Sequence, residues 1–166
     1  MNILKRVESS VLWLFEDNES AAKNLRSHAE SLGVNANRLV FAKLMPLSEH
    51  LARHRLADLF LDTLPYNAHT TASDALWAGL PVLTQYGSSF AGRVCASLLI
   101  TIGLKDLIVN SPDEYENRAV YLANHPTELS QLKNWLIQNS QSSPLFDSQR
   151  FAKEIENLYI NALNYS

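Results

Sequence analysis

The sequence predicts an α/β protein built on a parallel sheet with helices on both faces. Two observations lead to this class. Short apolar runs alternate with longer segments of helical periodicity along the 166 residues. The runs are apolar at consecutive positions, and strands that bury both sides in this way belong to parallel sheets that helices cover on both faces.

Five apolar runs are the predicted strands, because each is short and flanked by polar or turn-forming residues. The first is the clearest: Val11 to Phe15 is continuous and apolar, and it lies between Ser10 and Glu16. The five runs cover residues 11–15, 38–42, 59–61, 81–84 and, more weakly, 106–109.

The segments between and after the strands are predicted as helices from apolar residues at three- and four-residue spacing. Gly33, Gly79 and Gly103 are placed to end three of these helices, and Ser48 is the expected N-terminal cap of another. The predicted helices cover residues 19–32, 48–56, 70–78, 91–102, 112–123, 127–138 and 147–163. The segment 139–144 is the one linker-like stretch, and we expect it to let the last helix cross to another surface.

Composition restricts the class of protein. With 46% apolar and 19% charged residues, the chain has the composition of one globular domain of ordinary size. A net charge of −3 disfavours a nucleic-acid partner. The single cysteine, Cys95, excludes an intrachain disulfide. No signal peptide and no apolar run of the roughly 20 residues that span a bilayer is present, so we expect a cytoplasmic protein without a membrane segment.

Ligands of open parallel sheets bind beyond the carboxyl ends of the strands, which directs attention to residues 43–50, 62–71 and 85–93. The second of these is the most informative. His69, Thr70 and Thr71 start a predicted helix, whose N-terminus suits a phosphate group. Asp74 lies one turn later and could accept hydrogen bonds from sugar hydroxyls. Ordinary helix capping explains the same residue types, so the pattern alone leaves both interpretations open.

The other two segments carry weaker patterns. His50 and Arg53 lie on a short helix after the second strand, where Arg53 could bind a base carbonyl and His50 could stack or donate; an ordinary, partly buried histidine is the alternative. Residues 85–93 are glycine-rich but match neither GxGxxG nor a P-loop, so we expect a flexible connection. No Cys/His spacing indicates a metal site.

With these residues in place, the chain resembles the C-terminal catalytic lobe of O-linked N-acetylglucosamine transferases and their SPINDLY-type relatives. The resemblance extends over "NRLVFAKLMPLSEHLARHRLADLFLDTLPYNAHTTASDALWAGLPVLTQYGSSFAGRVCASLL", over "NILKRVESSVLWL" before it, and over "SPLFD" and "EIENLY" after it. The run from Leu56 to Gly79 is the most specific part, because it joins strand, loop, HTT motif and "LWAG" helix without a gap.

The resemblance implies a GT-B glycosyltransferase with two Rossmann-like lobes preceded by tetratricopeptide (TPR) repeats. The donor would be UDP-N-acetylglucosamine, used without a required metal or other cofactor, and the acceptor a Ser or Thr of a protein. Residues 1–166 would be the C-terminal nucleotide-sugar-binding lobe, truncated on its N-terminal side, with 145–166 as the crossing helix. By analogy, the UDP contacts fall into three groups: Thr70 and Thr71, with His69 beside them, for the diphosphate; Asp74 for the ribose; and His50, Arg53 and the backbone of Met45 for the uracil.

Two departures from the family pattern affect these expectations. Leu47 stands where the family usually has a lysine near the ribose, which leaves the identity of the donor sugar open. The family's catalytic lysine, its first and central strand, and the histidines of the N-terminal lobe would all lie upstream of Met1. We therefore expect little or no transferase activity from this chain alone, and dimerisation by strand exchange is one way to fill the sheet.

Two alternatives remain at this point. A degenerate binding or interaction module without catalysis is favoured by Leu47 and opposed by the complete HTT motif and Asp74. An unrelated NAD-binding domain is opposed by the lack of GxGxxG.

Overall fold

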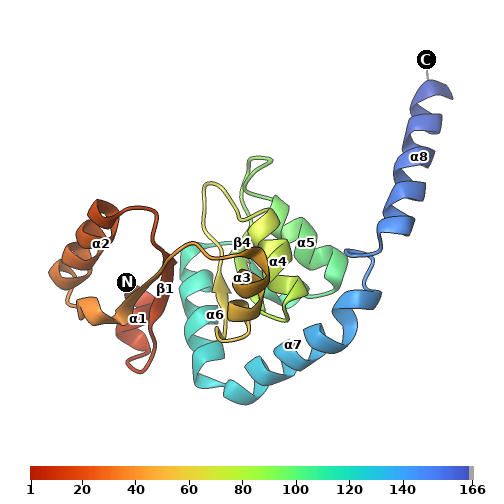
Figure 1. Cartoon of the computed structure of the whole chain (residues 1–166). Helices are drawn as coiled ribbons and strands as arrows, with labels where there is room; N and C mark the ends of the chain where they lie inside the picture. The colour runs from red at the N-terminus through yellow and green to blue at the C-terminus, as the bar shows by residue number, and fades with distance from the viewer. Residues whose placement is uncertain (165–166) are drawn as a thin grey trace.

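The computed structural model describes residues 1–164, which form a larger and a smaller unit and one projecting helix (Figure 1). The helices are α1 (Asn2–Arg6), α2 (Glu19–Ser31), α3 (Leu47–His54), α4 (Thr70–Trp77), α5 (Val94–Ile102), α6 (Pro112–Asn124), α7 (Pro126–Asn139) and α8 (Ser148–Asn164), with short 3-10 turns at Ala36–Arg38, Lys105–Leu107 and Ser140–Ser142. The strands are β1 (Leu12–Phe15), β2 (Leu39–Ala42), β3 (Phe60–Leu61), β4 (Val82–Gln85) and β5 (Ile108–Val109).

The smaller unit is a parallel pair of strands, β1 and β2, that α2 connects. Leu12 pairs with Leu39 and Phe15 with Ala42 at the two ends of the ladder. Leu12 and Leu14 turn toward a small core. Trp13 and Phe15 alternate with them and remain 38% and 53% exposed. One face of this sheet is therefore packed and the other is bare.

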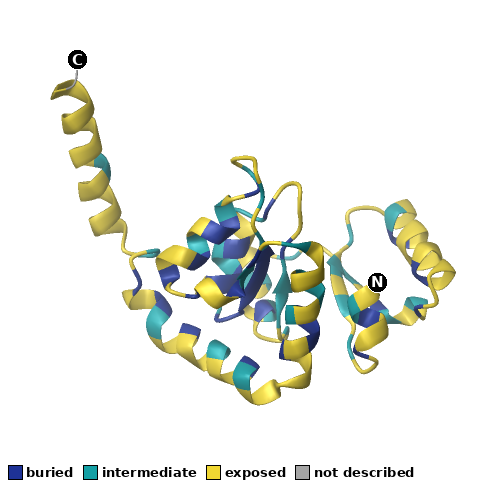
Figure 2. Ribbon diagram, turned by 180° about the vertical axis from the view of Figure 1, so that it is seen from behind, coloured by how far each residue is buried: buried dark blue, intermediate teal, exposed yellow. Residues whose placement is uncertain are grey.

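The larger unit is built on a parallel sheet with the strand order β3-β4-β5. Val82, Leu83 and Thr84 of β4 have no exposed surface, because helices cover both sides of the strand. Val82 faces the main core, which α4 and α5 line. Leu83 faces the opposite side, where Ala119 of α6 and Ile3 of α1 pack. The burial pattern in Figure 2 has its darkest region at this sheet, and the predicted helix-covered parallel sheet is confirmed here.

The strands form two separate parallel sheets within the described residues, because β1 and β3 do not pair with each other. Each strand has a neighbour on one side only: β1 pairs with β2, and β3 pairs with β4. The link between the units is α1 instead, which packs on α6. There the Asn2 side-chain amide donates a hydrogen bond of 2.7 Å to Glu116 Oε1.

The predicted element boundaries hold to within a few residues, with two corrections. Helix α3 starts at Leu47 with Pro46 as its N-cap residue, so Ser48 lies inside the first turn and does not cap it. The segment 139–144 is not an open linker. It contains a 3-10 turn, and its Ser140 and Ser143 are 3% and 6% exposed because they pack against the larger unit.

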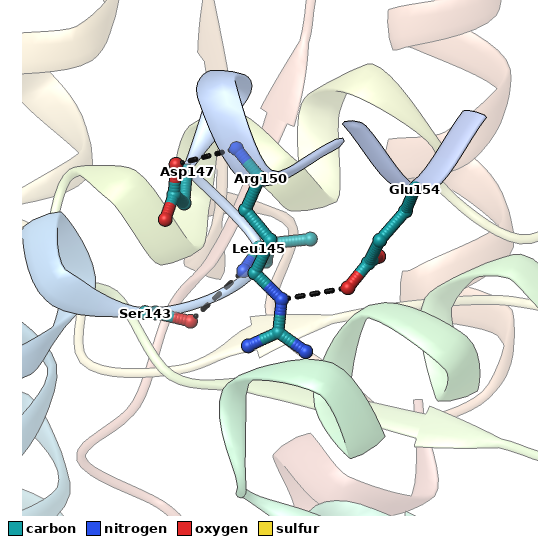
Figure 3. A network of polar contacts seen from close by, with 5 residues as sticks. All are labelled: Ser143, Leu145, Asp147, Arg150 and Glu154. Atoms are coloured by element: carbon teal, nitrogen blue, oxygen red, sulfur yellow. Dashed lines mark hydrogen bonds and ion pairs between the residues drawn. The ribbon is translucent and has the colours of Figure 1, made fainter. Parts of the chain in front are cut away.

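Helix α8 leaves this packed turn and extends away from the rest of the chain (Figure 1), with no buried residue along its length. Its start is held by local contacts, shown in Figure 3: Asp147 Oδ1 accepts from the Arg150 N–H at 2.9 Å, and Arg150 Nε donates to Glu154 at 2.7 Å. Phe151, Leu158 and other large apolar side chains of α8 are exposed. No helix in the described part of the chain could span a membrane by length and hydropathy.

The end of α4 provides a test of the packing between α4 and α7. Gly79 has φ +86°, and a Cβ atom there would come within 2.8 Å of the Ile137 side chain. Gly33 has a similar φ of +77° but open space around it. We expect Gly33→Ala to lower the free energy of unfolding by about 1 kcal/mol, from backbone strain alone. Gly79→Ala should cost about 1 kcal/mol more, because the exposed Ile137 side chain has to shift. Denaturant titration of both variants measures the difference, and equal losses would contradict the packing at Ile137.

Candidate functional site

The N-terminus of α4 has no side-chain cap, as is also the case for α1, α3, α5 and α7. Asn18, Ser111 and Asp147 cap α2, α6 and α8 by accepting from backbone N–H groups. The N-cap residue of α4 is His69, whose side chain makes no such bond. The capping explanation of the HTT motif is therefore wrong for this helix.

Three backbone donors are left at this end of α4. The first bond into the helix runs from the Ser73 N–H to the His69 carbonyl at 3.1 Å. The N–H groups of Thr70, Thr71 and Ala72 precede it, and none of them donates a hydrogen bond within the described residues. The side chains of Thr70 and Thr71 are exposed. Free N–H groups, hydroxyls and the positive end of the helix dipole together make an anion-binding arrangement.

The loop before α4 lines a cavity of about 330 Å³. The ring of Tyr66 stacks on that of His69, with centroids 4.8 Å apart, and Phe90 meets the His69 ring edge-on at 6.4 Å. His69 Nε2 and Asn67 Oδ1 are buried polar atoms without a hydrogen-bond partner in the described residues. Both residues line the cavity, but these two atoms are themselves covered by the surrounding loop.

A buried polar network beneath this loop was not predicted from the sequence. Asp62, 3% exposed, follows β3 directly. Its Oδ1 accepts from the Ala68 N–H and its Oδ2 from the Thr84 hydroxyl, each at 2.6 Å. The Tyr115 hydroxyl donates to the Asp62 carbonyl at 2.7 Å. Burial, and then the charge of Asp62, raises the pKa of Cys95, so this thiol keeps its proton. The only available signal was an acidic residue at the end of a buried strand.

Helix α3 brings together His50 and Arg53. Arg53 donates to the Lys43 carbonyl at 3.0 Å and to His50 Nδ1 at 2.7 Å. Because the guanidinium can only donate, Nδ1 of His50 accepts and the ring proton is carried by Nε2. Desolvation, then the charges of His54 and Arg53, lowers the pKa of His50, while Asp74 opposes the shift. The imidazole is therefore neutral near pH 7.

Asp74 connects the two groups of predicted site residues. It lies on α4, which packs against α3, and its charge acts on His50. His50, Arg53 and Asp74 thus lie near one another, while His69, Thr70 and Thr71 form the end of the same α4. Met45 lies half-buried in the loop before α3, and Leu47, at the start of that helix, is 66% exposed.

The glycine-rich segment after β4 is packed rather than loose. The Gly87 N–H donates to the Gly92 carbonyl at 2.8 Å, which closes the loop on itself. The Ala91 carbonyl accepts from the Asn67 N–H at 3.1 Å, which ties it to the loop before α4. A second depression, of about 380 Å³, lies along α2 and shares no residue with this region. The described residues hold no group of three His, Cys, Asp or Glu side chains that could bind a metal ion.

Comparison with known proteins agrees with the resemblance seen in the sequence. The family model for glycosyl transferase family 41 matches residues 1–155. A probable UDP-N-acetylglucosamine–peptide N-acetylglucosaminyltransferase, SEC, of Arabidopsis thaliana is 40% identical over 98% of the chain. The corresponding Caenorhabditis elegans transferase is 33% identical over 95%, and a probable SPINDLY transferase of Solanum lycopersicum is 37% identical over 85%.

The structural comparison gives the same result. A variant of the O-GlcNAc transferase of Thermobaculum terrenum matches 95% of the chain with a TM-score of 0.88 at 33% identity, and the match covers 31% of that protein. The chain spans only 17%, 14% and 15% of the three curated relatives. The family model nevertheless covers most of the chain, which therefore belongs to glycosyl transferase family 41.

Proposed function

We propose that this chain supplies the UDP-binding part of the donor site of a transferase that moves N-acetylglucosamine from UDP-N-acetylglucosamine to Ser or Thr residues of proteins. The observation that most directly supports this function is the uncapped N-terminus of α4, where three free N–H groups lie beside the hydroxyls of Thr70 and Thr71. A diphosphate satisfies such donors and is favoured by the helix dipole. The names of the matched relatives supply the sugar donor and the peptide acceptor.

The nucleoside half of UDP would lie toward α3. His50 offers a neutral ring with an N–H at Nε2, and Arg53 keeps further donors beyond its bonds to Lys43 and His50. The backbone of Met45, in the loop before α3, would contact the base as well. Asp74 can accept from ribose hydroxyls between the two helices.

The remainder of the enzyme belongs to the proposal as well. A parallel strand carrying the catalytic lysine would lie between β1 and β3, since each pairs with a neighbour on one side only; a second copy could supply it by strand exchange. Residues 145–166, of which the last two lie outside the described part, would form the crossing helix that packs on an N-terminal lobe after the TPR repeats. Without that lysine and that lobe, this chain alone would show little transfer.

A second candidate function is an interaction module that has lost the nucleotide. The exposed Leu47 favours it, because an apolar side chain cannot hydrogen-bond a ribose. The bare face of Trp13 and Phe15 favours it too, since exposed apolar surface marks contact with another protein. Nucleotide binding discriminates between the two functions.

Calorimetric titration with UDP tests the donor site. We expect saturable binding to the parent chain, and loss of that binding in the double variant Thr70→Ala, Thr71→Ala. Hydrogen bonds to a charged phosphate contribute about 1.5–3 kcal/mol each, so each hydroxyl is expected to change affinity by about tenfold or more.

The matched control for this titration is Thr127→Ala, which removes an exposed threonine from the first turn of α7. This variant should bind UDP like the parent. A folded parent that binds no UDP would contradict the claim that the pocket works in this chain and would favour the interaction module.

The leucine at position 47, where the family resemblance implies a lysine, is tested by a substitution that should increase the affinity for UDP. Leu47→Lys introduces the cation that the family carries there, on a side chain exposed enough to be replaced without a packing cost. We expect UDP to bind about threefold to tenfold more tightly. Leu44→Lys, at an 84% exposed position in the preceding loop, adds the same charge nearby. An equal gain in both variants would mean a general charge effect rather than a defined contact.

The proximity of α3 and α4 is testable by NMR without nucleotide. Because the Asp74 carboxylate raises the pKa of His50 against the larger opposing effects, Asp74→Asn should lower that pKa further. The titration of the His50 ring proton signal measures this, with Asp106→Asn, at an exposed site on another element, as the control. An unchanged His50 pKa in Asp74→Asn would refute the proximity of these two residues.

A further inference from the structure

We propose that Asp62 is a positioning residue, which acts through the backbone to hold the phosphate-binding end of α4 in place. This inference rests on the proposed function. Asp62 itself makes no contact with the free N–H groups of α4. Its carboxylate instead joins two parts of the fold that determine where those groups stand.

The two partners of the carboxylate have different origins. Thr84, bonded to Oδ2 at 2.6 Å, is itself fully buried and belongs to β4, which is paired on both edges. Ala68, bonded to Oδ1 at 2.6 Å, is the residue immediately before the N-cap residue His69. The carboxylate therefore ties the last loop residue before α4 to the central strand of the sheet. This tie fixes both ends of the loop formed by residues 63–67.

A second tether holds the same loop from the other side. The Asn67 N–H donates to Ala91 at 3.1 Å, and Ala91 belongs to the closed loop after β4. The stacking of Tyr66 on His69 adds a ring contact at the helix start. Donor groups that are held in place before a ligand arrives bind it with less loss of conformational entropy.

The ionised carboxylate fits this role better than a neutral amide. Both groups that bond to it, the Ala68 N–H and the Thr84 O–H, are donors. An ionised carboxylate only accepts, and bonds to it are shorter and stronger than bonds to a neutral acceptor. None of the ion pairs in the described residues involves Asp62. A buried charge without a cation persists only where its hydrogen bonds are made, and each carboxylate oxygen of Asp62 accepts one.

The test separates the two halves of the nucleotide. Calorimetry with UDP, uridine and inorganic pyrophosphate is performed on the parent, Asp62→Asn and Thr84→Val. We expect both variants to bind UDP and pyrophosphate about tenfold more weakly, because a charge-assisted tie is lost, while uridine, bound toward α3, changes by less than about twofold. Thr84→Ser keeps the hydroxyl and should bind all three ligands like the parent.

Asp106→Asn and Thr101→Val make the same chemical changes at exposed positions, and both control variants should bind like the parent.

A spectroscopic readout accompanies the titrations and needs no ligand. The Ala68 amide proton, bonded to a carboxylate at 2.6 Å, should resonate far downfield and move upfield in Asp62→Asn. The amide signals of residues 69–72 should shift with it. Should Asp62→Asn fail to fold, the pair Thr84→Val and Thr84→Ser carries both measurements.

Each contrary outcome has a separate meaning. Unchanged pyrophosphate affinity in folded variants overturns the inference. An equal loss of affinity for uridine and for pyrophosphate also overturns it, because it would mean that Asp62 only stabilises the fold as a whole. An Ala68 signal that ignores Asp62→Asn also overturns it. A parent that binds none of the three ligands contradicts the proposed function instead, and the amide signals then decide alone whether Asp62 positions the helix start.

Discussion

The pairing of β4 on both edges is the constraint on which the rest of the structure depends. β3 and β5 are two-residue strands, and each is held in the sheet by its ladder with β4. The same strand is packed on both faces, by α4 and α5 on one side and by α6 on the other. A strand restrained in this way is a fixed reference within the molecule. The polar groups of the candidate site are fixed relative to it through Thr84 and Asp62.

Local patterns predicted the elements of this fold well, and the reason is physical. Continuous apolar runs become strands because both of their sides have to be buried, and glycine ends helices where the backbone needs a positive φ, as at Gly79. The same patterns say nothing of which strands pair, and only the family resemblance pointed to a gap at the place of the central strand. Ser48 was mistaken for a cap because the restricted backbone of Pro46 precedes it and starts the helix one residue earlier.

The candidate site also has a part that the sequence predicted and a part that it did not. The HTT motif and the His50–Arg53 pair could be identified because their residue types and spacing carry the chemistry, and the structure gathers Asp74 with His50. Asp62 could not be identified from the sequence, because a charged residue after a strand is common at the boundary of any strand. Its partner Thr84 is also 22 positions away in the sequence. The packing of the segment 139–144 could not be predicted for a similar reason. A serine-rich segment is typical of a linker, and the sequence does not show that these serines are buried by residues far away in the chain.

The unequal cores of the two units have a consequence for how the chain unfolds. The core beside β1 and β2 contains four buried residues of the described chain, whereas the main core contains thirteen. The smaller unit should therefore open at a lower temperature, with faster amide exchange, while the larger unit remains folded. All residues of the candidate site from α3 onward belong to the larger unit. A ligand bound there would delay only the second of the two melting steps, so the step that moves would itself report where the ligand lies.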